Sequence, residues 1–120
     1  MNEKMRGLMG LALRAGQMTP GAAMTLDAVK AGRAALVLLD EGASENTRKK
    51  IRDACAYRRV PCFLLPEGWI DQSCGKEGRF AAAVAPGGLC EQMRRLMDAQ
   101  VQTDNIDQNQ FAERGGASGK

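Results

Sequence analysis

The feature that most constrains this fold is a set of three short apolar runs separated by helical patterns. The runs are AALVLLD at 34–40, VPCFLL at 60–65 and FAAAVA at 80–85. The first is too short for a typical helix and has no polar face, so it predicts a strand buried on both sides, and the other two have the same character. Alternation of such strands with helices predicts an α/β fold, a three-layer α/β/α sandwich. With a fourth short strand at 17–19, we expect a small mixed, largely parallel four-stranded sheet.

Helical spacing of apolar residues predicts the connecting helices, at about 2–15, 20–31, 45–58, 67–74 and from 86 onward. For the second helix, Thr19 is a favoured N-cap residue and Pro20 suits the first helical position. Gly21 and Ala22 then leave the first turn almost bare. Free N–H groups and the partial positive charge of such a helix start suit a phosphate or a closely approaching backbone. The alternative is a well-formed helix start that binds nothing. Ser44 is the expected N-cap of the third helix.

The helical spacing of apolar residues ends near residue 97, so we expect one domain at 1–97 and a disordered tail at 98–120. Residues 1–97 contain 15 Lys and Arg against 10 Asp and Glu, whereas the tail is mildly acidic. No apolar run is long enough to span a membrane, and the first helix is amphipathic rather than a signal peptide. We therefore expect a cytoplasmic, monomeric protein that does not contact a membrane.

The residue types present argue against catalysis. The chain has no histidine, and its four cysteines show no C-x-x-C spacing, which disfavours a zinc site and excludes Cys–His and Ser–His arrangements. We expect buried, reduced thiols. The adjacent acids Asp40 and Glu41 follow a strand, but a solvated turn is the simpler interpretation. We therefore expect a non-enzymatic protein with no catalytic residues, no metal and no cofactor.

A moderately basic domain suits nucleic acid. The candidate RNA-contacting residues are Gly21 and Ala22 at the helix start and the cations Lys30, Arg33, Arg48, Lys76 and Arg79. Phosphate contacts of this kind give salt-dependent affinity without sequence readout. A solvated helix face is the equally plausible alternative for the cations around Arg48. The few aromatic residues are interpreted as core, so no stacking platform for single strands is expected, and a folded RNA element is the expected ligand.

Three segments together resemble the ribosomal protein L-seven-Ae / L-thirty-e family, a superfamily of kink-turn RNA-binding proteins, and look most like its small bacterial members. They are GLALRAGQMTPG, AVKAGRAALVLLDEGASENTRKKIRDACAYRRVPCFLL and CGKEGRFAAAVAPGGL, which extend from about Leu8 to Met97. The resemblance implies an α/β/α sandwich that binds ribosomal or other kink-turn RNA. It also implies that binding uses the start of the second helix and the loop before the last strand.

The RNA-reading positions of that family are only partly retained. Its strongest RNA binders begin the second helix with Gly-x-Asn-Glu-x-x-Lys. Here Gly21 matches, but Ala23, Met24 and Asp27 stand where the family has Asn, Glu and Lys. The short helix also carries Ile70-Asp71 in place of the usual Leu-Gly pair.

Two hypotheses follow from the sequence. The first is an RNA-binding ribonucleoprotein component, ribosomal or ribosome-associated, that recognises kink-turn-like RNA such as ribosomal RNA, with ribosomal or other proteins as further partners. The second is a protein-interaction module that keeps the fold but has lost kink-turn recognition, because Ala23, Met24 and Leu26 make the RNA-facing surface more apolar.

Overall fold

Five helices and four strands alternate along the part of the chain that the structure describes. This is the backbone of residues 2–107 and the side chains of residues 3–99 in a computed structural model. In chain order the elements are α1 (Asn2–Arg14), β1 (Met18–Pro20), α2 (Ala22–Lys30), β2 (Leu36–Asp40), α3 (Glu45–Arg58), β3 (Cys62–Leu65), α4 (Trp69–Cys74), β4 (Ala81–Val84) and α5 (Gly88–Asp107). The predicted order of helices and strands is therefore confirmed.

The four strands form one sheet in the order β1-β4-β2-β3. β2 and β3 are parallel, with Val37 opposite Cys62, whereas β4 is antiparallel to both of its neighbours, β1 and β2. The sheet is mixed, as predicted, but the expectation that it is largely parallel is wrong. A continuous apolar run indicates that both faces of a strand are covered, and it carries no information on strand direction.

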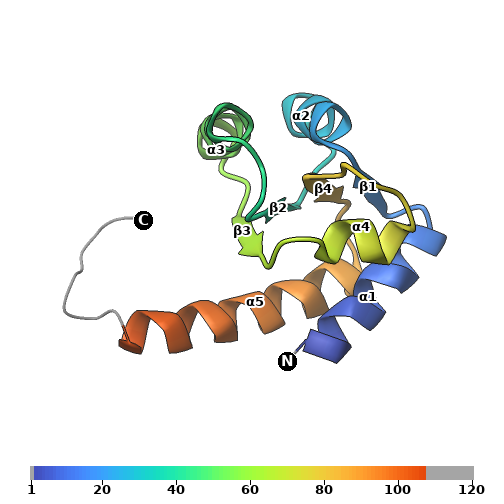
Figure 1. Cartoon of the computed structure of the whole chain (residues 1–120), viewed down its shortest axis with the longest axis vertical. Helices are drawn as coiled ribbons and strands as arrows, with labels where there is room; N and C mark the ends of the chain where they lie inside the picture. The colour runs from blue at the N-terminus through green and yellow to red at the C-terminus, as the bar shows by residue number, and fades with distance from the viewer. Residues whose placement is uncertain (1, 108–120) are drawn as a thin grey trace.

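Helices cover both faces of this sheet, which confirms the predicted three-layer sandwich (Figure 1). Successive residues of a strand point to opposite faces. Accordingly, Leu36 and Leu38 of β2 pack in the layer of α1, α4 and α5, while Val37 and Leu39 pack in the layer of α2 and α3. All residues of β2 and β4 are buried. The small alanines of β4 let the helices approach the sheet closely.

The first helix buries one stripe and exposes the rest. Met5, Leu8, Met9 and Ala12 of α1 are buried at helical spacing, as an amphipathic helix requires. No helix within residues 2–107 is both long enough and apolar enough to cross a membrane.

The second helix begins later than predicted. Thr19 and Pro20 belong to β1, where they pair with Ala83 and Ala82 of β4, and Gly21 is the N-cap residue. The predicted N-cap role of Thr19 is therefore wrong. β1 is an edge strand, where the missing N–H of a proline leaves no gap in the ladder, so Pro20 fits a strand as well as a helix start.

Other element ends agree with the sequence, with one exception. The Ser44 side chain accepts a hydrogen bond from the Thr47 N–H at 3.1 Å, which confirms the predicted cap of α3. Gly75 caps α4 in the left-handed conformation, so the helix ends at residue 74 as predicted. However, α5 runs on to Asp107, so residues 98–107 are helical, unlike the predicted tail. The remainder of that predicted tail, 108–120, lies outside the described residues.

All four cysteines are free thiols, but only two match the predicted burial. Cys55 and Cys90 are buried, whereas Cys62 and Cys74 are partly exposed. A hydrogen bond between the Cys55 and Cys62 side chains raises the pKa of Cys55 and lowers that of Cys62. The thiol that donates is held protonated, and the sulfur that accepts is stabilised as the thiolate.

Candidate nucleic-acid interface

One end of the sheet gathers the start of α2, the loop before β4 and the start of α3. The backbone N–H of Gly21 donates to the carbonyl of Ala81 at 2.7 Å, and that of Asp40 donates to the carbonyl of Phe80 at 2.8 Å. The beginning of α2 and the end of β2 therefore both flank the beginning of β4. We call this end the helix-start edge, defined as residues 21–24, 44–48 and 75–80.

The loop of residues 75–79 is held in place by one carboxylate. Asp71 of α4 accepts hydrogen bonds from the Gly78 N–H at 3.0 Å and from the Arg79 N–H at 2.7 Å. Bonds from N–H groups to an ionised carboxylate are stronger than bonds between neutral groups. Asp71 therefore fixes the path of a glycine-rich loop that would otherwise have few constraints.

The Arg79 side chain lies against the glycine that starts α2. A Cβ atom placed on Gly21 would be 3.8 Å from Arg79 Cδ and 3.9 Å from Met24 Cγ. The Arg79 guanidinium donates to the carbonyl of Glu77 at 3.1 Å, so this side chain is partly ordered by its own loop. The helix start and a braced cation thus form one local surface.

The predicted RNA-contacting residues fall into two groups. Gly21, Ala22, Lys76, Arg79 and Arg48 lie on the helix-start edge, with Arg48 on the first turn of α3.

Lys30 and Arg33 do not belong to this edge. They lie at the far end of α2, where the N–H of Ala35 donates to the carbonyl of Val84 at the other end of β4. A single compact site cannot include both groups, because α2 itself spans about 13 Å at 1.5 Å per residue.

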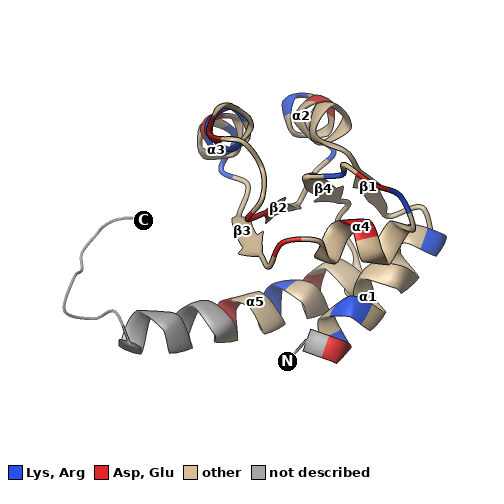
Figure 2. Cartoon of the chain, viewed as in Figure 1, with Lys and Arg blue, Asp and Glu red and all other residues tan. Residues whose placement is uncertain are grey.

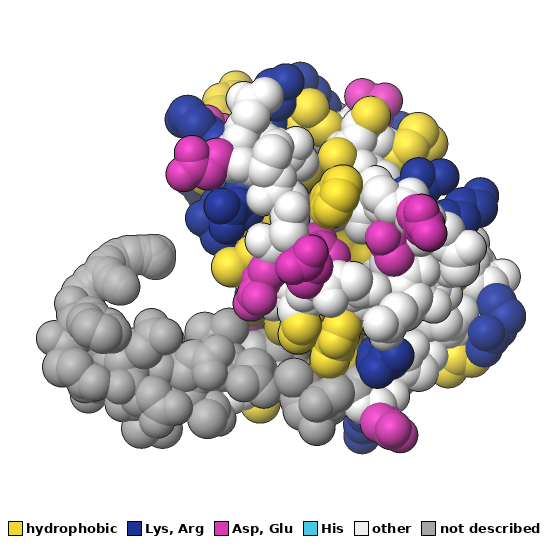
Figure 3. Space-filling model, viewed as in Figure 1, with side chains coloured by type: hydrophobic (Ala, Val, Ile, Leu, Met, Phe, Trp, Pro, Cys, Tyr) yellow, Lys and Arg dark blue, Asp and Glu magenta, His cyan; other side chains and the backbone are white. Residues whose placement is uncertain are grey.

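The helix-start edge is mixed in character rather than uniformly basic. Acidic residues occur on the loops after β2 and β3 and on α4, close to the basic residues of the loop before β4 (Figure 2). Hydrophobic atoms lie between acidic groups on the same face (Figure 3). Met24 and Phe80 are 54% and 38% exposed, and Ala23 and Asp27 are also exposed. This surface therefore offers both charge and apolar contact to a partner.

Asp40 has a structural role. Its side chain is buried and accepts hydrogen bonds from the Gly42 N–H at 2.6 Å and the Gly68 N–H at 2.9 Å. The carboxylate joins the loop after β2 to the loop after β3, so the interpretation of Asp40 and Glu41 as a solvated turn holds only for the exposed Glu41. Both Asp40 oxygens thus accept backbone N–H groups, and the side chain holds the two loops together.

Two residues of interest were missed by sequence reasoning. Asp71 enters the sequence analysis only as a departure from the family's Leu-Gly pair, although a carboxylate preceding a Gly-Lys-Glu-Gly loop is a suitable acceptor for its N–H groups. Tyr57 was assigned to the core with the other aromatics, yet it is 86% exposed. Its position two residues after the buried Cys55 turns it away from the apolar stripe of α3, and this helical spacing was the available signal. Among the described residues, no cluster of His, Cys, Asp or Glu could hold a metal ion.

The protein is thus a small α/β/α domain. The helix capped by Gly21 lies beside a basic loop that Asp71 holds in place. The chain is 35% identical over 97 residues to a protein of Enterococcus faecium named RNA-binding protein YlxQ, covering 80% of this chain and 93% of that protein. It is 38% identical over 92 residues to the protein of the same name from Bacillus subtilis (strain 168), covering 76% and 92%. The chain therefore belongs to the YlxQ family. No known family profile matches it.

Solved structures show the same architecture. A protein of unknown function from Bacillus halodurans C superposes with a TM-score of 0.74 at 30% identity, covering 79% of this chain and 97% of that one. The 15.5kD RNA binding protein of Giardia lamblia superposes with a TM-score of 0.64 at 17% identity, covering 86% and 92%. At that identity the second likeness concerns the fold alone. It is the fold expected from the resemblance to the L-seven-Ae / L-thirty-e family.

Proposed function

We propose that this protein is a non-enzymatic, cytoplasmic RNA-binding protein that recognises a structured RNA through its helix-start edge. The observation that carries the proposal is the position of the Arg79 side chain beside Gly21, which places a basic loop next to a bare helix start. The names of its curated relatives support RNA as the ligand. A ribosomal or ribosome-associated role, with ribosomal or kink-turn-like RNA as the target, is the finer form of the proposal.

Each part of the edge has a distinct task in this proposal. The first N–H groups of α2 point out of the helix and hydrogen-bond to a phosphate or a closely approaching sugar–phosphate backbone. Gly21 has no side chain to keep that backbone away. Arg79 and Lys76 add charge from the loop, and Arg48 adds it from α3. Asp71 positions the loop cations without contacting RNA.

Recognition by this edge depends on RNA shape more than on base reading. Ala23, Met24 and Asp27 replace the polar groups that the family resemblance implies for contacts with the sheared base pairs of a kink-turn. Asp27 in particular repels phosphate. We therefore expect weaker kink-turn binding than in family members with Asn, Glu and Lys at these positions.

A titration against a kink-turn RNA and a straight duplex of equal length tests the proposal. We expect binding to the kink-turn at low salt, with weaker binding to the duplex. The combined variant Ala23→Asn, Met24→Glu and Asp27→Lys should bind the kink-turn about tenfold more tightly or better. It regains the polar side chains that contact the sheared base pairs in the family. Absence of binding to either RNA at low salt would refute the function, and an unimproved variant would refute the account of positions 23, 24 and 27.

The second candidate is a protein-interaction module, favoured by the exposed Met24 and Phe80 on the same edge. Exposed apolar side chains of this size suit a protein partner, and methionine adapts to different surfaces. A pull-down from nuclease-treated lysate distinguishes the candidates. A partner that is retained after nuclease treatment and lost on Met24→Lys and Phe80→Lys substitution would favour this second candidate over RNA.

A further inference from the structure

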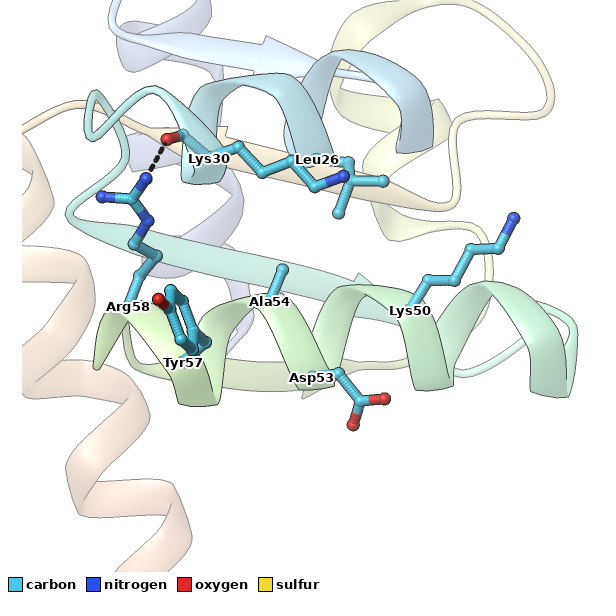
Figure 4. A pocket seen from close by; sticks show the side chains of 7 residues that line it. All are labelled: Leu26, Lys30, Lys50, Asp53, Ala54, Tyr57 and Arg58. Atoms are coloured by element: carbon cyan, nitrogen blue, oxygen red, sulfur yellow. Dashed lines mark hydrogen bonds between the residues drawn. The ribbon is translucent and has the colours of Figure 1, made fainter.

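A groove lies between α2 and α3 on the outer face of the sandwich, and it continues along both helices from the helix-start edge. It has a volume of about 600 Å³, within the range of about 300–1,000 Å³ that is usual for small-molecule sites. Figure 4 shows the residues that line it: Leu26, Lys30, Lys50, Asp53, Ala54, Tyr57 and Arg58. Neither hypothesis drawn from the sequence uses this groove, although it contains Lys30.

The groove combines an apolar floor with basic walls. Leu26 of α2 and Ala54 of α3 face each other across it, and Lys30 and Lys50 extend along its two sides (Figure 4). Among the described side chains, neither lysine forms a salt bridge. The charges of both lysines are therefore available to a ligand.

The single acid in the lining does not cancel this charge. Asp53 pairs with Lys49, Oδ2 to Nζ at 3.1 Å, and its side chain is directed away from α2 (Figure 4). Lys49 is not part of the groove lining. The groove therefore keeps a net positive charge from Lys30, Lys50 and Arg58.

Arg58 closes one end of the groove. Its guanidinium donates a hydrogen bond to the main-chain carbonyl of Lys30 at 2.5 Å, which ties the last turn of α3 to the last turn of α2. Tyr57 precedes it on α3 and is 86% exposed, with its ring beside the Arg58 side chain (Figure 4). An aromatic ring exposed to this extent contributes little to the core of the protein, so its packing surface is free for a ligand.

We propose that the groove between α2 and α3 holds an unpaired nucleotide of the bound RNA, with its base stacked on Tyr57. The flanking phosphates interact with Lys30 and Lys50. Base stacking on an aromatic residue together with backbone contacts to cations is how sequence-tolerant single-strand sites work. This inference rests on the proposed function, and it extends the RNA contact from the helix-start edge along α2. An acidic peptide would satisfy the lysines, but its carboxylates would not stack on the electron-rich face of the tyrosine ring as a base does.

The test uses three RNAs: a kink-turn hairpin, the same hairpin with a short single-stranded adenosine tail, and hexa-adenylate alone. Binding is measured by fluorescence anisotropy with the full chain and the variants Tyr57→Ala, Tyr57→Phe and Lys50→Ala. Arg95→Ala is the matched control, because Arg95 is an exposed cation on α5 in the opposite layer. Tyr57 and Lys50 are exposed, so equal melting temperatures are expected and are checked first.

We expect the tail to tighten binding and Tyr57→Ala to abolish that gain, with a loss of at least about fivefold. Tyr57→Phe should keep the gain because it keeps the ring. Lys50→Ala should weaken binding of the tailed RNA more than Arg95→Ala does. A Tyr57→Ala variant that binds the tailed hairpin as tightly as the unaltered protein overturns the inference while leaving the proposed function intact.

The experiment also separates the groove from the proposed function. Hexa-adenylate binding that depends on Tyr57, without any hairpin binding, supports the groove and refutes the proposed function. If poly-glutamate, but not hexa-adenylate, reverses the gain in affinity of the labelled tailed hairpin over the tail-less one, the groove is a site for an acidic protein segment and the inference is overturned.

Discussion

Gly21 links local conformation to the proposed interface. Its backbone has φ 115° and ψ 137°, a combination that residues with a Cβ rarely adopt. The space around it is open enough for a methyl group, since the nearest atom would be 3.8 Å away. Backbone conformation, rather than crowding, therefore requires glycine at the start of α2.

The substitution Gly21→Ala should destabilise the protein by about 1–2 kcal/mol through backbone strain. This corresponds to a fall in melting temperature of about 4–8 °C for each kcal/mol in a domain of this size. Gly7→Ala is the control, because Gly7 lies within α1, has no atom within 4 Å of a Cβ and has no positive φ. It should be neutral or stabilising. Equal melting temperatures for the two variants would contradict the argument.

α4 and the loop that follows it form the element that presents Lys76 and Arg79. The helix is short, and its main contribution to the interface is the Asp71 carboxylate, which receives the N–H groups of Gly78 and Arg79. The loop conformation therefore depends on the Asp71 side chain, and one substitution at this position can remove both hydrogen bonds.

The substitution Asp71→Ala should release the loop while the sandwich stays folded. We expect faster amide hydrogen exchange at Gly78 and Arg79 and about three- to tenfold weaker RNA binding, because the loop cations lose their fixed positions. Asp98→Ala is the matched control, since that exposed acid of α5 pairs with Arg94 and lies outside both proposed RNA contacts. Unchanged exchange at Gly78 and Arg79 in the Asp71 variant would show that other contacts hold the loop.

At the scale of the whole molecule, the basic residues proposed to contact RNA lie in two neighbouring regions. Arg48, Lys76 and Arg79 lie at the helix-start edge, whereas Lys30, Lys50 and Arg58 surround the groove between α2 and α3. Acidic residues separate basic ones on the face that includes the edge (Figure 2). RNA binding should therefore involve few phosphate contacts at each region.

The salt dependence of RNA binding should reflect this distribution. For a tail-less hairpin, the logarithm of the association constant should fall with the logarithm of salt concentration with a slope of about −3, as for roughly three phosphate contacts. Arg79→Ala should reduce the magnitude of the slope by about 1, and Arg95→Ala should leave it unchanged. A slope near zero would exclude phosphate contacts as the source of affinity.

The order of the elements, the capped start of α3 and the three-layer architecture can all be predicted from the amino-acid sequence. These follow from local periodicity and from side chains such as Ser44 that act on their own backbone neighbours. The sequence also indicates seven candidate RNA-contacting residues, of which the structure brings all but Lys30 and Arg33 to the helix-start edge. A short continuous apolar run indicates a segment that is covered on both faces, and the three runs of this kind all contain strands.

Strand direction, the position of Pro20 and the exposure of Tyr57 become visible only in the folded protein. Antiparallel pairing of β4, the placement of Pro20 in an edge strand and the separation of Lys30 from Gly21 all depend on which segments meet in space. The same is true of the groove, which exists because α2 and α3 lie side by side with Arg58 joined to the Lys30 carbonyl. Contacts between residues far apart in the chain leave no periodic signal in a single sequence, and this is the physical reason that the groove emerged only from the fold.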